Sequence, residues 1–250
     1  MAALAATAAA DAAAVDAIHV VLTGPADRAA DWLAGAARRG HTEAQTILGQ
    51  WLLDGHGVER NHAEALFWFK TAAVSGHAMA ANMLGRCYEH GWGAPACDKT
   101  AAHWYARAAD AGLDWGQYNY ATSLQLGRGV PQDRAQAFAF FQAAAAQGHA
   151  KSINVVGGFY EDGWEVEADL GMALYCYLRA AEGGDFRGQF NAARLFALAD
   201  RADEALTWMR AVPRSATPAF LAKAHDFLAG HPDARLRTLA GTLESESPCC

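Results

Sequence analysis

The sequence predicts an all-α fold, a right-handed α/α superhelical solenoid of about five two-helix repeats with degenerate capping helices at both ends. Three observations predict it. Five columns of residues recur every 36 positions in one register, and apolar residues inside each repeat follow helical spacing. The hydrophobic share of 52% includes many alanines, which favour helix because they lose no side-chain entropy.

The 36-residue repeat is carried by glycines, alanines and large aromatic side chains. Several columns that keep one register without a gap indicate repeated structural units that stack on one another. The columns are Gly40, Gly76, Gly112, Gly148 and Gly184; Gly55, Gly91, Gly127 and Gly163; Ala37, Ala73, Ala109, Ala145 and Ala181; Ala65, Ala101, Ala137 and Ala173; and Trp32, Trp68, Trp104 and Phe140.

Each repeat contains two helical stretches, as 77–112 illustrates. Ala80, Leu84 and Tyr88 recur four residues apart and form one apolar stripe on a first helix. Gly91 and Gly93 are expected to end that helix, because glycine adopts the left-handed conformation that closes helices. The expected buried face of the second helix comprises Ala101, Trp104, Tyr105, Ala108 and Ala109.

Short polar residues precede the second helices and are predicted to cap them. A side-chain oxygen at this position accepts a hydrogen bond from a backbone amide that lacks a helical partner. The predicted caps are Asn61, Asp98, Asp133 and Asp169.

A column of small residues lies within the first helices. We expect it to let each first helix approach its neighbour closely, with an aromatic side chain of the second helix filling the remaining space. The column is Gly49, Gly85, Ala121 and Gly157.

The sequence indicates one solenoid domain over 1–250, without a linker. Atypical units are expected at the ends of a repeat array. The expected parts are a degenerate helical pair at 1–40; full repeats at 41–76, 77–112, 113–148 and 149–184; a shortened repeat at 185–212; capping helices at 213–243; and a tail at 244–250.

The loops and the helices that follow them resemble the Sel-1-like repeat, a member of the tetratricopeptide-like superfamily. The resemblance covers about residues 29 to 212 and departs from the pattern at Gly163–Val166, where the second loop glycine is missing. It implies a scaffold that binds other proteins through first helices lining a concave face. The matching runs are LGQWLLDGHGV (Leu48–Val58), LGRCYEHGWGA (Leu84–Ala94) and ATSLQLGRGV (Ala121–Val130), followed by ALFWFKTAAVSG (Ala65–Gly76), AHWYARAADAG (Ala102–Gly112) and AFFQAAAAQG (Ala139–Gly148).

Charge and hydropathy disfavour several classes of partner. The formal net charge is −7 and no stripe of lysine and arginine is visible, so we expect no nucleic-acid binding. No window approaches the ~20 apolar residues that a membrane span needs. The N-terminal stretch Met1–Val15 lacks the basic start of a secretory signal, so we expect a cytoplasmic protein. The composition separately favours a bacterial source.

No constellation typical of catalysis, a cofactor or a metal stands out. The glycine pairs of the loops follow helices, whereas a dinucleotide site needs a preceding strand. His41, His77 and His149 are separated by repeat steps and are interpreted as turn residues, so no metal site is expected. The odd cysteine count argues against a disulfide framework. Cys87, Cys97 and Cys176 are interpreted as core residues, and a role for the final pair, Cys249 and Cys250, stays open.

The expected binding surface is the first-helix stripe opposite the buried one, which the resemblance places on the concave face. Methionine, tryptophan and arginine are favoured in binding surfaces, and asparagine can hold an extended peptide backbone. The alternative is that Met83 and Trp115 pack internally. The candidate residues are Met79, Met83, Arg86, His90, Trp115, Asn119, Thr122, Leu126, Lys151, Val155, Arg187, Asn191 and Arg194.

The predicted function is therefore a non-catalytic scaffold or adaptor that binds a partner protein or peptide segment, without a cofactor. A second hypothesis is β-lactam binding or hydrolysis, which the resemblance associates with a cysteine-rich, secreted branch having a cysteine pair in almost every repeat. Here only one repeat has such a pair, Cys87 and Cys97. Self-association through an end of the stack is a third possibility.

Overall fold

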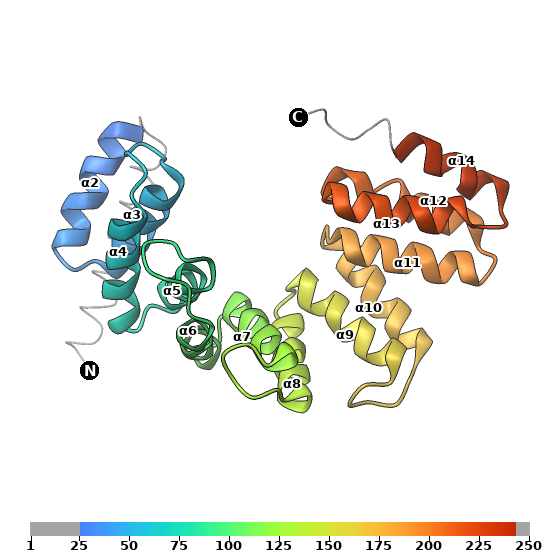
Figure 1. The fold of residues 1–250 in the computed structure, drawn as a ribbon, viewed down its shortest axis with the longest axis horizontal. Coiled ribbons are helices and arrows are strands. Elements are labelled where there is room, and N and C mark those ends of the chain that lie inside the picture. The colour runs from blue at the N-terminus through green and yellow to red at the C-terminus, as the bar shows by residue number, and fades with distance from the viewer. Residues whose placement is uncertain (1–25, 244–250) are drawn as a thin grey trace, which may run out of the picture. The chain divides into compact units, whose positions relative to one another are not determined.

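The computed structural model describes residues 26–243, and these form helices without a strand, which confirms the all-α prediction (Figure 1). A single 3-10 turn, Val212–Arg214, lies between α12 and α13. The helices are α2 (Ala26–Arg38), α3 (Thr42–Asp54), α4 (His62–Val74), α5 (Ala78–His90), α6 (Asp98–Asp110), α7 (Asp114–Leu126), α8 (Arg134–Ala146), α9 (Ala150–Asp162), α10 (Leu170–Glu182), α11 (Phe186–Leu198), α12 (Ala202–Met209), α13 (Pro218–Ala229) and α14 (Ala234–Leu243).

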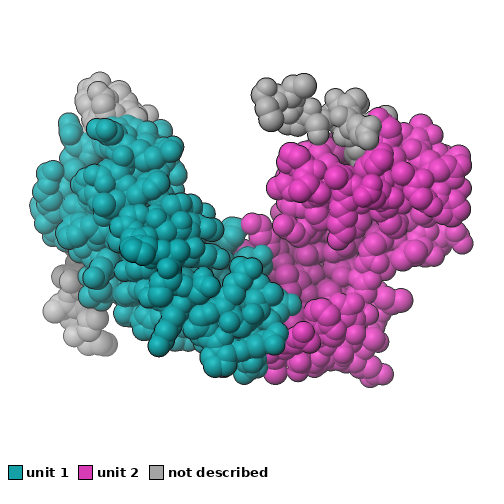
Figure 2. Space-filling view, viewed as in Figure 1, with its two compact units in different colours: residues 1–133 teal, residues 134–250 magenta. Residues whose placement is uncertain are grey.

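The described chain forms two compact units, 26–133 and 134–243, which Figure 2 shows in teal and magenta. The first unit contains α2 to α7 and the second contains α8 to α14. Within each unit helices adjacent in sequence pack together, from α2 on α3 to α6 on α7 and from α8 on α9 to α11 on α12. The first helices of successive repeats also touch, α5 with α7 and α9 with α11. Consecutive helical pairs are thus the building blocks of both units.

The predicted glycines end the first helices. Gly55, Gly91, Gly127 and Gly163 each adopt the left-handed conformation after α3, α5, α7 and α9. The second loop glycines also have positive φ, and where the fourth repeat lacks this glycine, Glu165 takes the same conformation at φ 59°. The loop therefore keeps its path although the residue that favours it is gone.

The predicted caps of the second helices are confirmed in part. The side chain of Asn61 accepts a hydrogen bond from the amide of Glu64, and Asp169 accepts from the amides of Gly171 and Met172. The prediction for Asp98 is wrong, because α6 already begins at that residue.

The cap position of α6 is occupied by Cys97, which the sequence analysis had placed in the core. Cys97 is exposed, and its sulfur accepts a hydrogen bond from Thr100 Oγ1 at 3.2 Å. Asp133 directly precedes α8.

The side chains that follow the closing glycines cap the first helices α5, α9 and α11, whereas His41 before α3 and Leu113 before α7 make no such hydrogen bond. His77 Nδ1 accepts from the amide of Ala80, and His149 Nδ1 accepts from the amide of Ser152. Asp185 does the same for α11 through the amide of Gly188. A histidine ring nitrogen and a carboxylate thus cap a first helix at equivalent positions. This agrees with the interpretation of His77 and His149 as turn residues.

The glycines of the small-residue column, Gly49, Gly85 and Gly157, bring α3, α5 and α9 against an aromatic ring of the following second helix. A methyl group built on Gly85 would lie 2.6 Å from the Tyr105 ring, and one on Gly157 would lie 2.7 Å from the Tyr177 ring. These separations are far below van der Waals contact, so only glycine fits there. Both rings are buried. Tyr105 directly follows Trp104 of the predicted aromatic column, whereas Tyr177 follows Cys176, one repeat after the column ends at Phe140.

The C-terminal side of the described chain departs from the full repeats. The loop of the fifth repeat is short, since α11 ends at Leu198 and α12 begins at Ala202. Helices α13 and α14 follow, and Leu221, Leu228 and Leu236 of these helices pack with α11 and α12 in one apolar core. Most of the degenerate pair at 1–40 lies outside the described residues, as do Cys249 and Cys250.

Two neighbouring glycines of α9 provide a matched test of this packing. We expect Gly157→Ala to lower the free energy of unfolding by about 1–3 kcal/mol, because its methyl group overlaps the Tyr177 ring. Gly158→Ala should instead raise it by about 0.5–1 kcal/mol, since alanine favours helix and the nearest atom, the Tyr177 hydroxyl oxygen, is 3.8 Å away. Urea denaturation of both variants measures the difference, and equal effects would refute the steric account.

Candidate partner-binding surface

In the first unit the predicted stripe lies on α5 and α7 and remains partly open to solvent. Trp115 is 40% exposed and Leu126 is 52% exposed, and Met79 and His90 are also exposed. The Trp115 ring lies 6.4 Å from the Tyr118 ring in an edge-on arrangement. Large apolar side chains exposed in this way are typical of contact sites for partners.

Met83 contributes little surface, because it is only 5% exposed and packs in the apolar core of the first unit. The neighbouring Arg86 is half-buried and lies over the Trp92 ring, 5.4 Å from its centre. One guanidinium nitrogen of Arg86 also lies 3.7 Å from the Met83 sulfur. Met83 therefore positions Arg86 rather than presenting an apolar surface of its own.

The two asparagines proposed to hold a peptide backbone instead join successive first helices. Asn119 Nδ2 donates to Asn82 Oδ1 at 2.8 Å, and Asn191 Nδ2 donates to Asn154 Oδ1 at 3.0 Å. Asn82 and Asn154 are buried. A buried amide oxygen without a partner would be costly, so these bonds hold the first helices in register.

Arg194, proposed as a partner contact, forms an ion pair inside the second unit. Its Nη2 lies 2.6 Å from both carboxylate oxygens of Glu161, and the Tyr177 hydroxyl donates to Glu161 at 2.7 Å. The Arg194 and Glu161 side chains are only 23% and 20% exposed. Burial raises the pKa of Glu161, but the hydrogen bonds from Arg194 and Tyr177 and the arginine charge outweigh it and lower the pKa overall.

The other candidates of the second unit surround the start of α11. Arg187 is exposed and its guanidinium lies 4.5 Å from the centre of the Phe186 ring. Lys151 and Val155 are half-buried. Burial raises the pKa of the Asp185 cap, and the hydrogen bond from Gly188 and the charges of Arg187 and Lys151 partly offset that rise.

A hollow of about 200 Å³ lies between α5, α6 and α7 on the candidate surface. The sequence patterns do not predict this hollow, although Asn119 and Thr122 belong to its wall. Glu89 and Tyr105 lie on another side, where the Tyr105 hydroxyl donates to Glu89 Oε2 at 2.5 Å. Burial raises the pKa of Tyr105, and the hydrogen bond to Glu89 adds to that effect.

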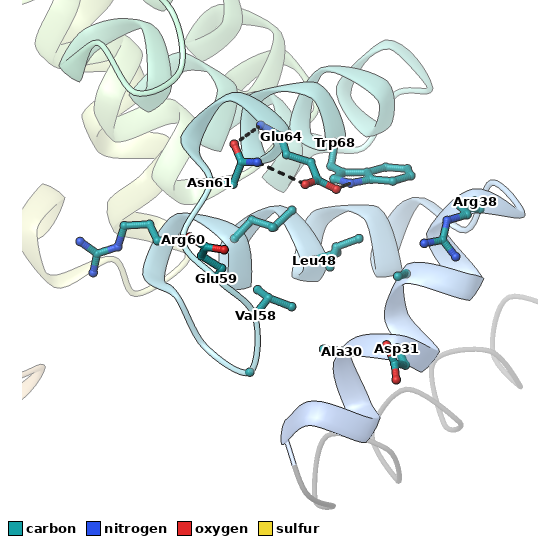
Figure 3. A pocket seen from close by; sticks show the side chains of 13 residues that line it. Ala30, Asp31, Arg38, Leu48, Val58, Glu59, Arg60, Asn61, Glu64 and Trp68 are labelled. Atoms are coloured by element: carbon teal, nitrogen blue, oxygen red, sulfur yellow. Dashed lines mark hydrogen bonds between the residues drawn. The ribbon is translucent and has the colours of Figure 1, made fainter.

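A larger hollow of about 600 Å³ lies between α2, α3 and α4 (Figure 3). Figure 3 shows Asn61 and Glu64 turned toward one another with Trp68 beside them. Asn61 caps α4 and the Trp68 ring nitrogen donates to Glu64 at 3.4 Å. These polar groups thus serve the start of α4.

The cysteines and histidines of the described residues suggest no metal chemistry. Cys87 and Cys176 are buried free thiols, as the core interpretation expected, and Cys97 is a free exposed thiol. Burial raises the pKa of Cys87 to about 11. Among residues 26–243 no group of three or more metal-ligating side chains is placed to hold an ion, and no helix there is long and apolar enough to cross a membrane.

Stacked helical pairs with glycine-closed first helices define an α-helical repeat protein. Within this class the chain belongs to the Sel1 repeat family, whose model matches residues 42–77, 78–113, 116–149 and 150–185, more than half of the chain. Proteins built from these repeats are generally protein-interaction scaffolds. A search of curated proteins found no match.

Solved structures with the same fold support this assignment. A protective antigen present in uropathogenic Escherichia coli strains, c5321, is 27% identical with a TM-score of 0.72. The match covers 89% of this chain and 49% of the antigen, so this chain spans about half of that protein. A Sel1 repeat protein from Oxalobacter formigenes is 23% identical with a TM-score of 0.78, over 92% of this chain and 97% of the other.

The Glu161–Arg194 pair makes stability depend on pH. We expect Glu161→Gln to lower the free energy of unfolding by about 1–2 kcal/mol at pH 7, because it leaves a half-buried arginine without its carboxylate. The pKa of Glu161 is lowered in the folded state, so its contribution is fully present above the unfolded pKa of about 4.3 and is lost as pH falls through the folded value. The difference from wild type should therefore shrink below about pH 4. Denaturation from pH 3 to pH 7 measures it.

The matched control is Glu204→Gln, which removes an exposed carboxylate from its pair with Arg201. Solvent screens that pair, so we expect little change at any pH. Equal destabilisation by the two variants would contradict the contribution assigned to Glu161.

Proposed function

We propose that this protein is a non-catalytic scaffold that binds a partner protein or peptide segment on the exposed first-helix face of its first unit. The single observation that carries the proposal is the solvent exposure of Trp115 and Leu126 on α7, together with Met79 on α5. Membership of the Sel1 repeat family supports this role. The repeat cores themselves give no reason for these side chains to be large and apolar.

The polar groups around these apolar residues favour binding of a protein. Apolar anchors surrounded by groups that can form hydrogen bonds are typical of the centre of a protein interface. Half-buried Thr122 and Asn119 lie on the same helix as Trp115, and Arg86 lies on the neighbouring first helix. In the second unit, taken by itself, Arg187 stays an exposed candidate contact, whereas Arg194 is already paired with Glu161.

The Sel1 repeats found here argue for the scaffold over a β-lactam-directed enzyme. The resemblance ties that activity to a cysteine pair in almost every repeat, whereas Cys87 and Cys97 are the single such pair and are both free. We propose that the protein acts in the cytoplasm. Its surface would bind the partner through noncovalent contacts alone, without a cofactor.

A photo-crosslinking experiment tests the location of the surface. We expect a benzophenone amino acid at Leu126 to form a discrete covalent adduct with a partner in cells that carry the gene, because Leu126 lies on the proposed face. The same group at Phe67, which is 58% exposed on the second helix α4, serves as the control. Adducts that form equally at Phe67, or none at Leu126, would contradict the proposal.

Substitution of the aromatic anchor tests its energetic contribution. Trp115→Ala should weaken binding of the crosslinked partner at least about thirtyfold, as expected for an interface hot spot worth roughly 2 kcal/mol. Phe67→Ala should leave the affinity unchanged. Isothermal titration calorimetry with the purified partner measures both, and equal affinities of all three proteins would refute the assignment of Trp115.

A further inference from the structure

Two carboxylate–tyrosine pairs occupy equivalent positions two repeats apart. Tyr105 donates to Glu89 in the first unit, and Tyr177 donates to Glu161 in the second. Both separations equal 72 residues (161 − 89 and 177 − 105). In each pair the carboxylate is at the end of a first helix and the tyrosine is on the following second helix. The two sites are therefore built on the same plan.

The two sites differ in what faces the carboxylate. In the second unit Arg194, 33 residues after Glu161, contacts both carboxylate oxygens at 2.6 Å. The equivalent residue in the first unit is Thr122, also 33 residues after its glutamate (122 − 89). Its hydroxyl donates to the backbone oxygen of Tyr118 at 2.9 Å, back along its own helix. The guanidinium found in one site thus has no counterpart in the other.

A hollow lies where that guanidinium would be. Thr122, Glu89 and Tyr105 all belong to its wall, and its volume of about 200 Å³ is several times the ~30 Å³ share of one water molecule. Asp98 lies on the same wall, and Tyr118 adds an aromatic surface beside Trp115. Tyr118 therefore links the wall of the hollow to Trp115.

The charges around the hollow are only partly balanced. His90 Nε2 lies 3.9 Å from Glu89, at the limit of an ion pair. Arg86 contacts Trp92 and Met83, and its charge also acts on Tyr105, where it lowers the pKa and partly offsets the effect of burial. Arg128 lies on the rim, and within the described residues no ion pair joins it to Glu89 or Asp98. The Glu89 carboxylate is consequently available to a cation from outside.

We propose that this hollow is a socket for an arginine side chain of the bound partner, with Glu89 taking the part that Glu161 takes toward Arg194. The inference rests on the proposed scaffold function and specifies the chemistry that the partner must present. A guanidinium suits the site because its planar fork pairs with a carboxylate and stacks on aromatic side chains such as Tyr118. Trp115 would contact the residues that flank the arginine.

The experiment uses the full chain and three blocked peptides, acetyl-Gly-Arg-Gly-amide and the same peptide with citrulline or lysine in place of arginine. We expect the arginine peptide to cause saturable NMR shifts at the amides of Thr122 and Asn119. The citrulline peptide, which has the same shape without the charge, should bind at least about tenfold more weakly, and the lysine peptide should also bind more weakly.

Two variants and a control assign the site. Glu89→Gln should weaken the arginine peptide at least about tenfold, whereas Glu161→Gln at the equivalent position should not change its binding. Thr122→Arg should abolish binding by filling the socket from within, and should raise the melting temperature by forming a pair with Glu89. Equal binding of the arginine and citrulline peptides, full binding by Glu89→Gln, or no saturable shift at Thr122 would overturn the proposal.

The outcomes separate this inference from the scaffold function. If Leu126 forms its adduct in both the wild-type and the Glu89→Gln backgrounds and the wild-type protein binds no arginine peptide, the scaffold stands and the socket is wrong. If the arginine peptide binds through Glu89 while no adduct forms at Leu126, the socket stands and the scaffold is wrong.

Discussion

Close approach of a first helix to an aromatic ring of its partner helix is the constraint on which the structure depends. At Gly85 and Gly157 even one methyl group would overlap the Tyr105 or Tyr177 ring. Helices of this length are marginal alone, so each needs the apolar surface that its neighbour supplies. The glycine makes that contact possible and also fixes where the tyrosine hydroxyl lies. The hydroxyl then reaches a glutamate at the end of the same first helix, which couples the packing of the core to the polar chemistry of the surface.

The polar contacts follow a period of two repeats, whereas the apolar packing follows one. The asparagine bridges, Asn82 with Asn119 and Asn154 with Asn191, have the same 72-residue spacing as the glutamate–tyrosine pairs. Alternation of this kind lets one scaffold present different side chains on neighbouring steps without a change in its core. Thr122 and Arg194 occupy equivalent positions and show the result. The short Thr122 side chain leaves a hollow beside Glu89, whereas the Arg194 guanidinium lies against Glu161.

The repeat, the helices and their ends could be predicted because they depend on residues close in sequence. Glycine closure and apolar stripes were visible as local patterns. The cap of α6 was misplaced because Asp98 is a good cap residue, but the actual cap position holds Cys97. The burial of Met83 and the ion pair of Arg194 could not be predicted from helical periodicity. Each depends on contacts with another helix, as with Arg194 and Glu161, which are 33 residues apart. The glutamates and the tyrosines of the two pairs are each 72 residues apart, and this spacing was a sequence signal that could have pointed to the proposed socket.

Glu165 shows how much of the loop geometry is imposed from outside the loop. Its left-handed backbone costs a non-glycine residue roughly 1–2 kcal/mol, yet the turn keeps the conformation of its glycine-containing equivalents. The anchored helices on either side hold the path, so the tip can change its side chains while the connection survives. Related arrays can therefore diversify at these tips with little structural penalty, and a degenerate loop motif is a poor guide to where an array stops.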